Sequence, residues 1–340
     1  MDKSLTGKIR SARPPKIPRI AGQSMGWAQE LEPDGHGNLI WALTYFLVGS
    51  ECRFSCSMCD LWKYTLDAKK TPVGSVTLQI ENLHRRIARE NPNRNPREWL
   101  KLYNASNFFD PANVDPSEHP TIAQWCRGFE RVIVENHAAL LARQNIRDSV
   151  LRFRDLLDGE LEIAMGLETI DPQGRKWLNK SMSLDQFAKA VEFLGGEAIH
   201  VRAFVLLQPL GTPLADSVDW AVRSSQWAAQ CGANRICLIP TRTGNGFIQS
   251  VAKQVAWQPP TARQLEQAFE KLLQDRLGQS ARETSEVIYT VDLWDWDSML
   301  GKCSTCSEPR HERLKQMNYS QCFQSDVSSH LCDCQAIQIK

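Results

Sequence analysis

Short apolar runs alternate with amphipathic stretches along most of this 340-residue chain. Seven of the runs are rich in β-branched and aromatic residues and have the length of buried strands; they cover 39–48, 99–103, 130–135, 161–167, 199–207, 234–240 and 286–292. Between them, apolar residues recur at helical spacing in 183–195, in 213–230 and after Thr261. Strand–helix alternation of this length predicts an α/β fold, with a parallel sheet that is wrapped by helices and is either open or closed into a barrel.

The segment 161–168 predicts which side of the sheet faces a ligand. Side chains alternate along a strand, so this one has a bulky apolar face and a second face of small or acidic residues. The first face holds Leu161, Ile163, Met165 and Leu167, and the second holds Glu162, Ala164, Gly166 and Glu168. We expect the bulky face to pack against helices and the other to line the interior, with Glu168 at the reactive end of the strand.

The composition suits one large or two modest globular domains, with 42% hydrophobic and 23% charged residues. A net charge of +1 neither indicates nor excludes nucleic acid as a partner. The apolar run at 39–48 is too short to cross a bilayer, and no apolar region typical of a secretory signal follows the basic start. We therefore expect no membrane contact and a cytoplasmic protein, in which the 11 cysteines indicate metal or redox chemistry rather than disulfides.

Three regions differ in their patterning. Residues 1–37 form a basic N-terminal arm, because the first 22 positions carry six Lys or Arg residues against one acid and include three prolines. Such an arm is either solvated or in contact with a polyanion. Residues 38–292 form the core. Residues 293–340 form a cysteine-rich extension with little apolar periodicity, expected to be an appendage.

Cys52, Cys56 and Cys59 lie within eight residues of one another, directly after the first predicted strand. A closed zinc site commonly has four ligands, and no histidine lies near these three thiols. Disulfide exchange by a C-x-x-C pair would leave Cys52 without a role. A [4Fe–4S] cluster normally takes four thiolates, so three would leave one iron open to an exogenous ligand. The spacing therefore favours a reactive iron–sulfur centre at the functional edge of the sheet.

The spacing Cys52-x₃-Cys56-x₂-Cys59 after the first strand of a βα series resembles the signature of the radical S-adenosylmethionine (SAM) superfamily. The resemblance covers roughly residues 38–292 and implies a partial (βα)₆ TIM-like barrel. It implies a [4Fe–4S] cluster and SAM as cofactors, and reductive cleavage of SAM to a 5′-deoxyadenosyl radical that abstracts hydrogen from a substrate. It also implies a low-potential electron donor such as flavodoxin or ferredoxin.

Shorter stretches resemble the radical SAM subunit of archaeosine synthase and its bacterial relatives. They are KLYNASNFFDP (101–111), VIVEN (132–136), GLET (166–169), NKSM (179–182) and CSTC (303–306). This resemblance implies a 7-deazaguanine base in tRNA as substrate, cleavage of a C–N bond in a lysine adduct, and tRNA or a base-modifying enzyme as partner. Asp60-Leu61-Trp62 stands where the archaeal proteins have a Gly-Tyr pair, a difference that bears on substrate identity. More distantly, the core resembles the elongator acetyltransferase subunit and coproporphyrinogen dehydrogenase.

Five polar residues are expected to bind the cofactor. Asn104 and Ser106 follow the second strand, where many superfamily members carry a Gly-Gly-Glu that is absent here. Glu135 ends its strand and matches a carboxylate near SAM in the relatives, with a surface glutamate as the alternative. Glu168 matches a residue that contacts the SAM ribose, with capping of the next helix as the alternative. Arg202 needs an anion inside a barrel, which is either a ligand carboxylate or an internal acid.

Cys303 and Cys306 form half of a metal site in the extension. Cys322, Cys332, Cys334 or His311 can complete it for zinc or for a second iron–sulfur cluster, and uncoordinated thiols are the alternative. Nearby, Trp294 and Trp296 either stack a base or pack a strand end. Two other functions stay open: a radical SAM enzyme that acts on a small metabolite or peptide, and a non-catalytic zinc protein that holds RNA with its basic arm.

Overall fold

The computed structural model describes residues 4–90, 98–243, 245–278, 287–299 and 305–325. Its centre is one eight-stranded sheet in which the strands follow one another in chain order. They are β1 (Gly26–Pro33), β2 (Leu39–Phe46), β3 (Trp99–Tyr103), β4 (Arg131–Glu135), β5 (Glu160–Glu168), β6 (His200–Leu207), β7 (Arg235–Pro240) and β8 (Ile288–Val291). β1 runs antiparallel to β2, and all later neighbours are parallel.

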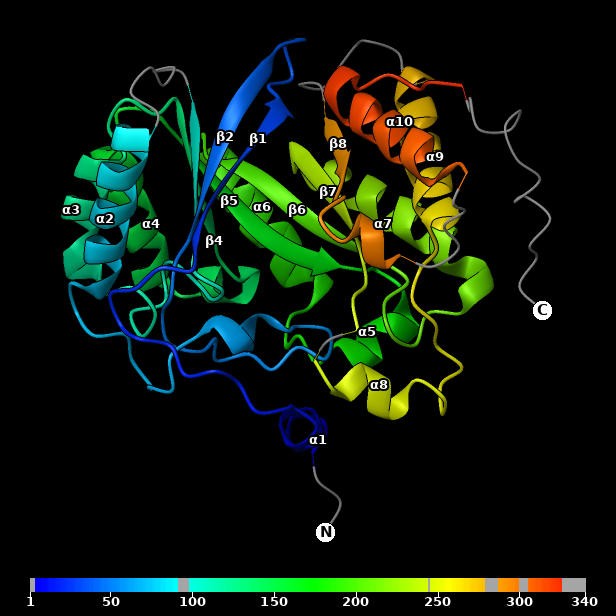
Figure 1. Cartoon of the computed structure of the whole chain (residues 1–340), viewed down its shortest axis with the longest axis horizontal. Helices are drawn as coiled ribbons and strands as arrows, with labels where there is room; N and C mark the ends of the chain where they lie inside the picture. Colours follow the sequence, from blue (N-terminus) through cyan, green and yellow to red (C-terminus); the bar gives the residue numbers. More distant parts are fainter. Residues whose placement is uncertain (1–3, 91–97, 244, 279–286, 300–304, 326–340) are drawn as a thin grey trace.

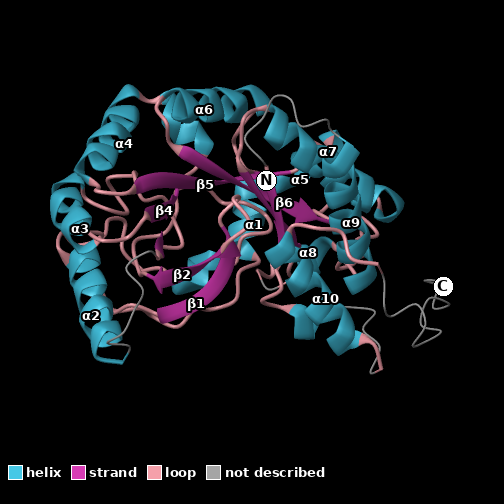
Figure 2. Cartoon of the chain, turned by 90° about the horizontal axis from the view of Figure 1, so that it is seen from above, coloured by secondary structure: helices cyan, strands magenta, loops and turns pink. Residues whose placement is uncertain are grey.

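Six helices form an arc around the outside of the curled sheet (Figure 2). They are α2 (Ser75–Glu90), α3 (His119–Trp125), α4 (Gln144–Leu156), α6 (Leu184–Gly196), α7 (Ser217–Gln230) and α9 (Ala262–Gly278). Three short helices lie beyond the carboxyl ends of the parallel strands (Figure 1): α1 (Leu5–Ser11), α5 (Pro172–Leu178) and α8 (Phe247–Val251). Among the described residues, β2 to β7 are each followed by at least one helix, which confirms the predicted partial (βα)₆ barrel.

The two faces of β5 lie as its alternation predicts. Its bulky residues Leu161, Ile163, Met165 and Leu167 belong to the main apolar core between the sheet and the helices. Ala164 belongs to a separate inner group with Ala42, Trp99 and Ile133. All seven predicted strands are present, with ends within two residues of those expected. The interior of the curled sheet is therefore the side on which a ligand can bind.

The predicted basic arm at 1–37 contains two elements of the fold. Residues 26–33 form β1, which pairs along its full length with β2. Before it, α1 buries Ile9 in a small apolar cluster that includes Leu210, Phe247 and Trp257. The arm is thus neither a solvated tail nor an extended strand throughout, because both of its elements pack on the core.

Part of the predicted appendage at 293–340 also belongs to the core. Helix α10 (Ser307–Ser320) contacts β1 and β8, the two edge strands of the sheet (Figure 1). Its Asn318 side chain accepts from the Val291 N–H at 2.8 Å and donates to the Val291 carbonyl at 3.0 Å. Gln321 binds Tyr289 of β8 in the same manner. The helix therefore covers an edge that would otherwise expose unpaired backbone groups.

Candidate active site

The three-cysteine loop connects β2 to α2 at the carboxyl edge of the sheet. Cys56 is buried, and Cys52 and Cys59 are half-buried. Distant segments fix the loop backbone: the Asn179 amide donates to the Ser55 carbonyl at 2.7 Å, and the Asn245 amide donates to the Ser57 carbonyl. The loop is thus shaped by residues from the second half of the barrel.

The N-terminal arm holds the outer side of this loop. Arg10 Nε donates to Ser55 Oγ at 3.0 Å, and Arg13 forms an ion pair of 2.7 Å with Glu51. Lys16 donates to the Thr65 carbonyl at 3.1 Å. Three of the basic residues that suggested a free arm are therefore structural contacts of the cysteine loop.

The three thiols of the loop do not have the lowered pKa values of a reactive redox pair. Burial raises the pKa of all three thiols, to about 11 for Cys56. Thiols in such surroundings stay protonated unless a cation replaces the proton, and a metal provides that charge. Asn107 Nδ2 already donates to the Cys52 sulfur at 3.1 Å, as it would to a metal-bound thiolate. These residues fit a metal centre better than a redox pair.

The positions of the three thiols are compatible with a cluster. In the part of the chain that the structure describes, no three His, Cys, Asp or Glu side chains converge closely enough to hold one metal ion. Four ligands around one zinc must all lie about 2.0–2.3 Å from the same point. In a [4Fe–4S] cluster each thiolate binds its own iron, so Cys52, Cys56 and Cys59 need not converge on one point.

An interior cavity of about 610 Å³ lies against the loop. Cys59 lines it from one side, and residues of β1, β3 to β8 and α10 line it from the others. Of the predicted cofactor-binding residues, Glu135, Glu168 and Arg202 line this cavity. The structure therefore brings one cysteine and three of the five predicted residues to a common space.

Glu168 lies at the end of β5 in a backbone conformation with φ of +69°. Its Oε1 accepts from Lys180 Nζ at 2.6 Å. The carboxylate folds back over Gly166, where an added Cβ would lie 2.0 Å from Oε1. Asp171, not Glu168, caps the following helix α5, so the capping alternative for Glu168 is wrong.

Glu135 ends β4 with one carboxylate oxygen still available. Burial raises the pKa of Glu135 to about 7, although the backbone N–H groups of Asn104 and Ala105 oppose this shift. Its Oε2 is buried and has no partner among the described residues. A buried acceptor without a partner has a cost that a ligand donor would remove. The surface alternative for Glu135 is therefore wrong.

Asn104 and Ser106 lie on the turn after β3 and are not among the residues that line the cavity. Within the described ranges, Asn104 Nδ2 and Ser106 Oγ are buried without a partner. The turn between them places Ala105 at φ of +54°. The structure connects this turn to Glu135 through its backbone, and the direct role of the two side chains in cofactor binding stays a prediction.

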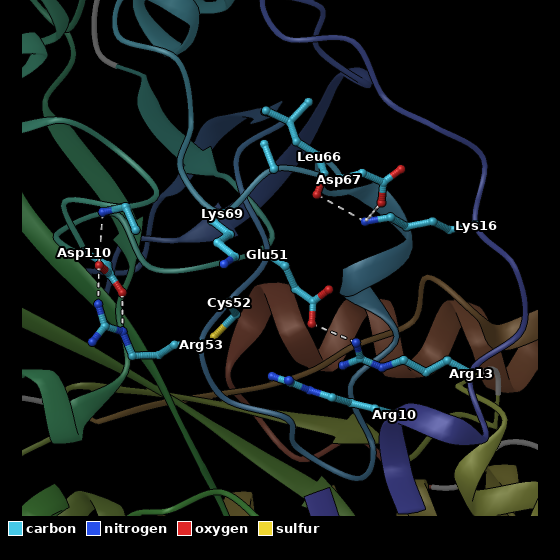
Figure 3. A pocket seen from close by; sticks show the side chains of 12 residues that line it. Arg10, Arg13, Lys16, Glu51, Cys52, Arg53, Leu66, Asp67, Lys69 and Asp110 are labelled. Atoms are coloured by element: carbon cyan, nitrogen blue, oxygen red, sulfur yellow. Dashed lines mark hydrogen bonds and ion pairs between the residues drawn. The ribbon is translucent and has the colours of Figure 1, made fainter. Parts of the chain in front are cut away.

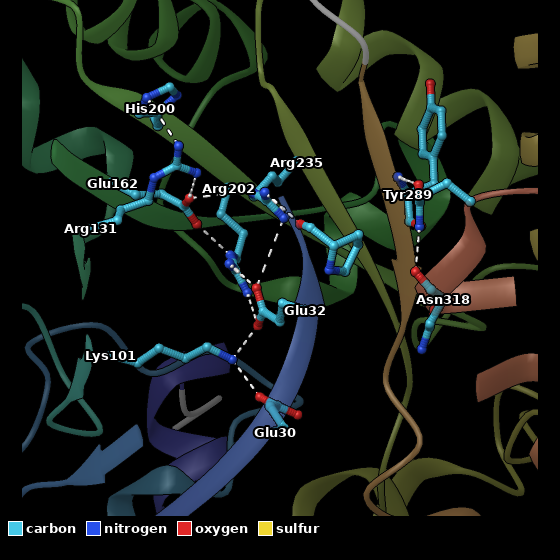
Figure 4. Close-up of polar contacts among 12 residues, drawn as sticks. Glu30, Glu32, Lys101, Arg131, Glu162, His200, Arg202, Arg235, Tyr289 and Asn318 are labelled. Atoms are coloured by element: carbon cyan, nitrogen blue, oxygen red, sulfur yellow. Dashed lines mark hydrogen bonds and ion pairs between the residues drawn. The ribbon is translucent and has the colours of Figure 1, made fainter. Parts of the chain in front are cut away.

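Arg202 finds its anion inside the protein. Its guanidinium binds Glu162 at 2.5 Å and Glu32 at 2.7 Å, and all three side chains are buried (Figure 4). The internal-acid alternative thus accounts for Arg202 without a ligand, and a further contact with cofactor stays a prediction. Glu32 lies on β1, an element that the apolar pattern did not predict, so the pairing was not foreseeable.

The extension provides little support for a second metal site. Cys303, Cys332 and Cys334 lie outside the described residues. Cys306 is buried at the start of α10, whereas Cys322 is exposed beyond its end. Neither zinc nor a second cluster at the half-site finds support in the described part of the extension. Trp296 is buried and packs beside His311, but Trp294 is 60% exposed at the rim of the cavity.

Two contacts of the site were missed from the sequence. Lys180 pairs with Glu168 and adds a positive charge near Cys52 and Cys56. His137 stacks on Phe54 of the cysteine loop, with ring centroids 3.8 Å apart. Burial lowers the pKa of His137 to about 3, so the ring packs as a neutral group. The NKSM stretch was the available signal for Lys180, but its spacing alone does not indicate a partner.

No protein-family model matches this chain. An uncharacterised protein of Methanocaldococcus jannaschii is 22% identical over 152 residues, which cover 44% of this chain and 41% of that protein. The archaeal Elp3 of Methanocaldococcus infernus superposes with a TM-score of 0.50 and 10% identity over 72% of this chain and 59% of that one. The fold resembles the radical SAM partial barrel.

Two further solved structures have a TM-score of 0.48. A radical SAM methyltransferase from Sphaerobacter thermophilus is 14% identical, over 82% of this chain and 76% of that one. Streptococcus suis SuiB, solved with S-adenosylmethionine bound, is 10% identical over 76% of this chain, and the chain spans only 52% of SuiB. No helix in the described ranges is long and apolar enough to cross a membrane.

Proposed function

We propose that this chain is a radical SAM enzyme. The observation that carries the proposal is the position of the cysteine loop: it stands at the carboxyl edge of a curled half-barrel, and Cys59 opens into the same cavity as Glu135 and Glu168. Cys52, Cys56 and Cys59 would hold a [4Fe–4S] cluster. When bound together, the cluster and SAM supply a one-electron reductive cleavage that yields a 5′-deoxyadenosyl radical for hydrogen abstraction.

The side chains around the cavity would bind and orient SAM. A carboxylate accepts two hydroxyl hydrogens, which suits Glu168 for a ribose, and the available oxygen of Glu135 accepts one more donor. Lys180 holds the Glu168 carboxylate in place through its 2.6 Å contact. Phe204 and Leu206 provide an apolar wall that keeps water away from a reactive intermediate.

As substrate we propose a modified purine in tRNA, cleaved at a C–N bond in the manner of archaeosine synthase. The rim of the cavity supports this choice. Trp294 exposes a ring on which a base can stack. A small metabolite or a peptide without an aromatic group would gain less from this exposed ring.

The class of enzyme is tested by anaerobic reconstitution with iron and sulfide. We expect brown protein that converts SAM to 5′-deoxyadenosine with dithionite, and a Cys56→Ala variant that loses the iron and at least about 1,000-fold in rate. Cys231→Ala is the matched control, because Cys231 is a half-buried thiol at the end of α7. Colourless wild-type protein that binds zinc and leaves SAM intact would refute the proposal.

The substrate class is tested by isotope transfer. Deuterated tRNA that carries the lysine adduct of a 7-deazaguanine base should pass deuterium to 5′-deoxyadenosine. Trp294→Ala should raise the KM for this tRNA about tenfold, since stacking on one base contributes about 1–3 kcal/mol. Trp220→Ala on the outer helix α7 is the control. Deuterium transfer from a peptide or a metabolite, but not from tRNA, would refute tRNA as the substrate.

A further inference from the structure

The cysteine loop separates two hollows. Cys59 lines the interior cavity, whereas Cys52 lines a second hollow of about 610 Å³ on the outer side of the loop (Figure 3). Residues of the N-terminal arm, the cysteine loop and the turn after β3 form this outer hollow: Arg10, Arg13, Lys16, Glu51, Cys52, Arg53, Leu66, Asp67, Ala68, Lys69, Asp110 and Ala112. The two sides of the proposed cluster site are therefore accessible from different directions.

Cations exceed acids in the outer hollow by five to three. Each acid is already neutralised: Glu51 by Arg13 at 2.7 Å, Asp67 by Lys16 at 2.9 Å and Asp110 by Arg53 at 2.5 Å. Two positive charges remain as the surplus of the hollow. A surface of this kind attracts an acidic partner and aligns it through charge complementarity.

Arg10 and Lys69 carry the surplus charge. Both are exposed, and neither forms an ion pair with another residue of the described chain. Arg10 is anchored through its Nε on Ser55 Oγ, so its remaining donors face the hollow (Figure 3). Lys69 lies on the opposite rim, in the segment that leads to α2. The wall between these two cations holds the Cys52 sulfur.

We propose that the outer hollow is the docking surface for an acidic, low-potential electron-transfer protein, whose electron enters the cluster on the Cys52 side. This inference rests on the proposed function, which needs a one-electron reductant. One electron leaves the reduced donor and the oxidised cluster gains it, with no bond formed or broken. Electrons and SAM then reach the cluster from opposite sides, so the donor does not compete with SAM or substrate for the interior cavity.

An acidic protein suits this hollow better than RNA does. None of the residues that line the hollow is aromatic, so it has no ring on which a base could stack. A partner protein with acidic side chains around its redox group tolerates a rim of mixed charge, because rim charges chiefly govern how fast two proteins associate.

The test uses reconstituted full-length enzyme and an acidic flavodoxin as the probe. Lys69→Glu should lower the association rate constant for flavodoxin at least about tenfold, and the rate of flavodoxin-driven 5′-deoxyadenosine formation should fall in parallel. The rate with dithionite should be unchanged, since a small reductant needs no docking surface. Lys189→Glu, a reversal on the outer helix α6, should leave all three measurements unchanged.

The outcomes separate the two proposals. Wild-type enzyme that is inert with dithionite would overturn the proposed function. Enzyme that is active with dithionite, but whose association with flavodoxin is insensitive to Lys69→Glu and to ionic strength, would overturn the docking surface. Competition of RNA with flavodoxin for association, lost in Lys69→Glu, would assign the hollow to a nucleic acid instead. A carbodiimide cross-link between Lys69 and a flavodoxin carboxylate would support the docking surface directly.

Discussion

Glu162, at the amino ends of the strands, and Glu135, at their carboxyl ends, differ in how fully their carboxylates are paired. At the amino ends of the strands, Glu162 binds Arg131, Arg202 and Arg235, so that every charge has a partner (Figure 4). At the carboxyl ends, Glu135 keeps a buried oxygen without a partner in the described part of the chain. Satisfied charges fix a structure, and unsatisfied ones mark the place where a ligand completes it.

The paired charges at the amino ends of the parallel strands also connect β1 with β6 and β7, across the open side of the half-barrel. Glu32 of β1 reaches Arg202 of β6, and Arg235 of β7 donates to the Pro33 carbonyl at 2.7 Å. The guanidinium groups of Arg131 and Arg235 lie 4.5 and 4.4 Å from the centre of the Trp99 ring. These contacts join the first strand to the far side of the sheet, which gives the interior a fixed floor below the cavity.

Replacement of Glu162, the acid that three arginines share, should lower the stability of the protein more than substitution of Glu135 or Gly166. Glu162→Gln leaves three buried guanidinium groups short of a charge, so we expect the free energy of unfolding to fall by about 3–5 kcal/mol. Urea unfolding followed by circular dichroism measures it. Glu160→Gln is the control, because Glu160 is half-exposed and its pair with Arg131 contributes at most about 1 kcal/mol. Equal losses in the free energy of unfolding for the two variants would contradict the conclusion that Glu162 is needed to neutralise the buried arginines.

At the unsatisfied end, Glu135→Gln should have the opposite effect on stability. The pKa of Glu135 is about 7 in the folded protein and lies near 4.5 in the unfolded chain. Between these values the folded state holds a proton that the unfolded state has lost, so stability falls as pH rises from about 4.5 to 7. We expect the variant to lack this fall and to be more stable than the wild type at pH 8, by about 3 kcal/mol.

The same variant should bind SAM more weakly, which equilibrium dialysis can measure with reconstituted enzyme. Gln keeps the shape of the side chain but loses the charge, so the expected loss is about tenfold, as for one charge-assisted hydrogen bond. A variant that is more stable and yet binds SAM as tightly as the wild type would show that Glu135 is a structural group.

A substitution in β5 should have a smaller effect, and it tests the role of the Lys180–Glu168 pair. In Gly166→Ala the new methyl group takes the space of the Glu168 carboxylate and lies 2.6 Å from Lys180 Nζ, so the pair must separate. We expect SAM affinity to fall a few fold, with little change in the denaturation midpoint. Gly195→Ala on α6 is the control, since an added Cβ there meets no atom within 4 Å. A large loss of stability in Gly166→Ala would instead indicate that the pair supports the sheet.

Apolar periodicity predicted the strands whose buried residues are apolar. The seven strands β2 to β8 bury apolar residues against helices, and each was foreseeable from its run of β-branched residues. β1 was not, because Glu30 and Glu32 point into the interior and are neutralised by residues far along the chain. A strand that buries charges has no apolar signature, and its partners are known only once the barrel is assembled.

Helix α10 escaped prediction for the same reason. Its inner face carries Arg310 and Arg313, which are buried against Glu266 of α9. Of the site, the cysteine spacing predicted the loop, and the strand ends predicted Glu135 and Glu168. The contacts of Lys180, Asn107 and Asn245 depend on how loops meet in space, so no local pattern could indicate them.

The anchoring of the cysteine loop has a consequence for how the protein is made. Ser57 is held by Asn245, which lies 188 positions later in the chain. At about 5–20 residues per second, a ribosome needs roughly 10–40 s to progress from one to the other. During that interval the three thiols have left the exit tunnel without their final geometry. For the proposed [4Fe–4S] cluster, this means that loading with iron and sulfide follows translation of the barrel. A nascent chain stalled before residue 245 would carry the three thiols without the Asn245 contact that shapes their loop.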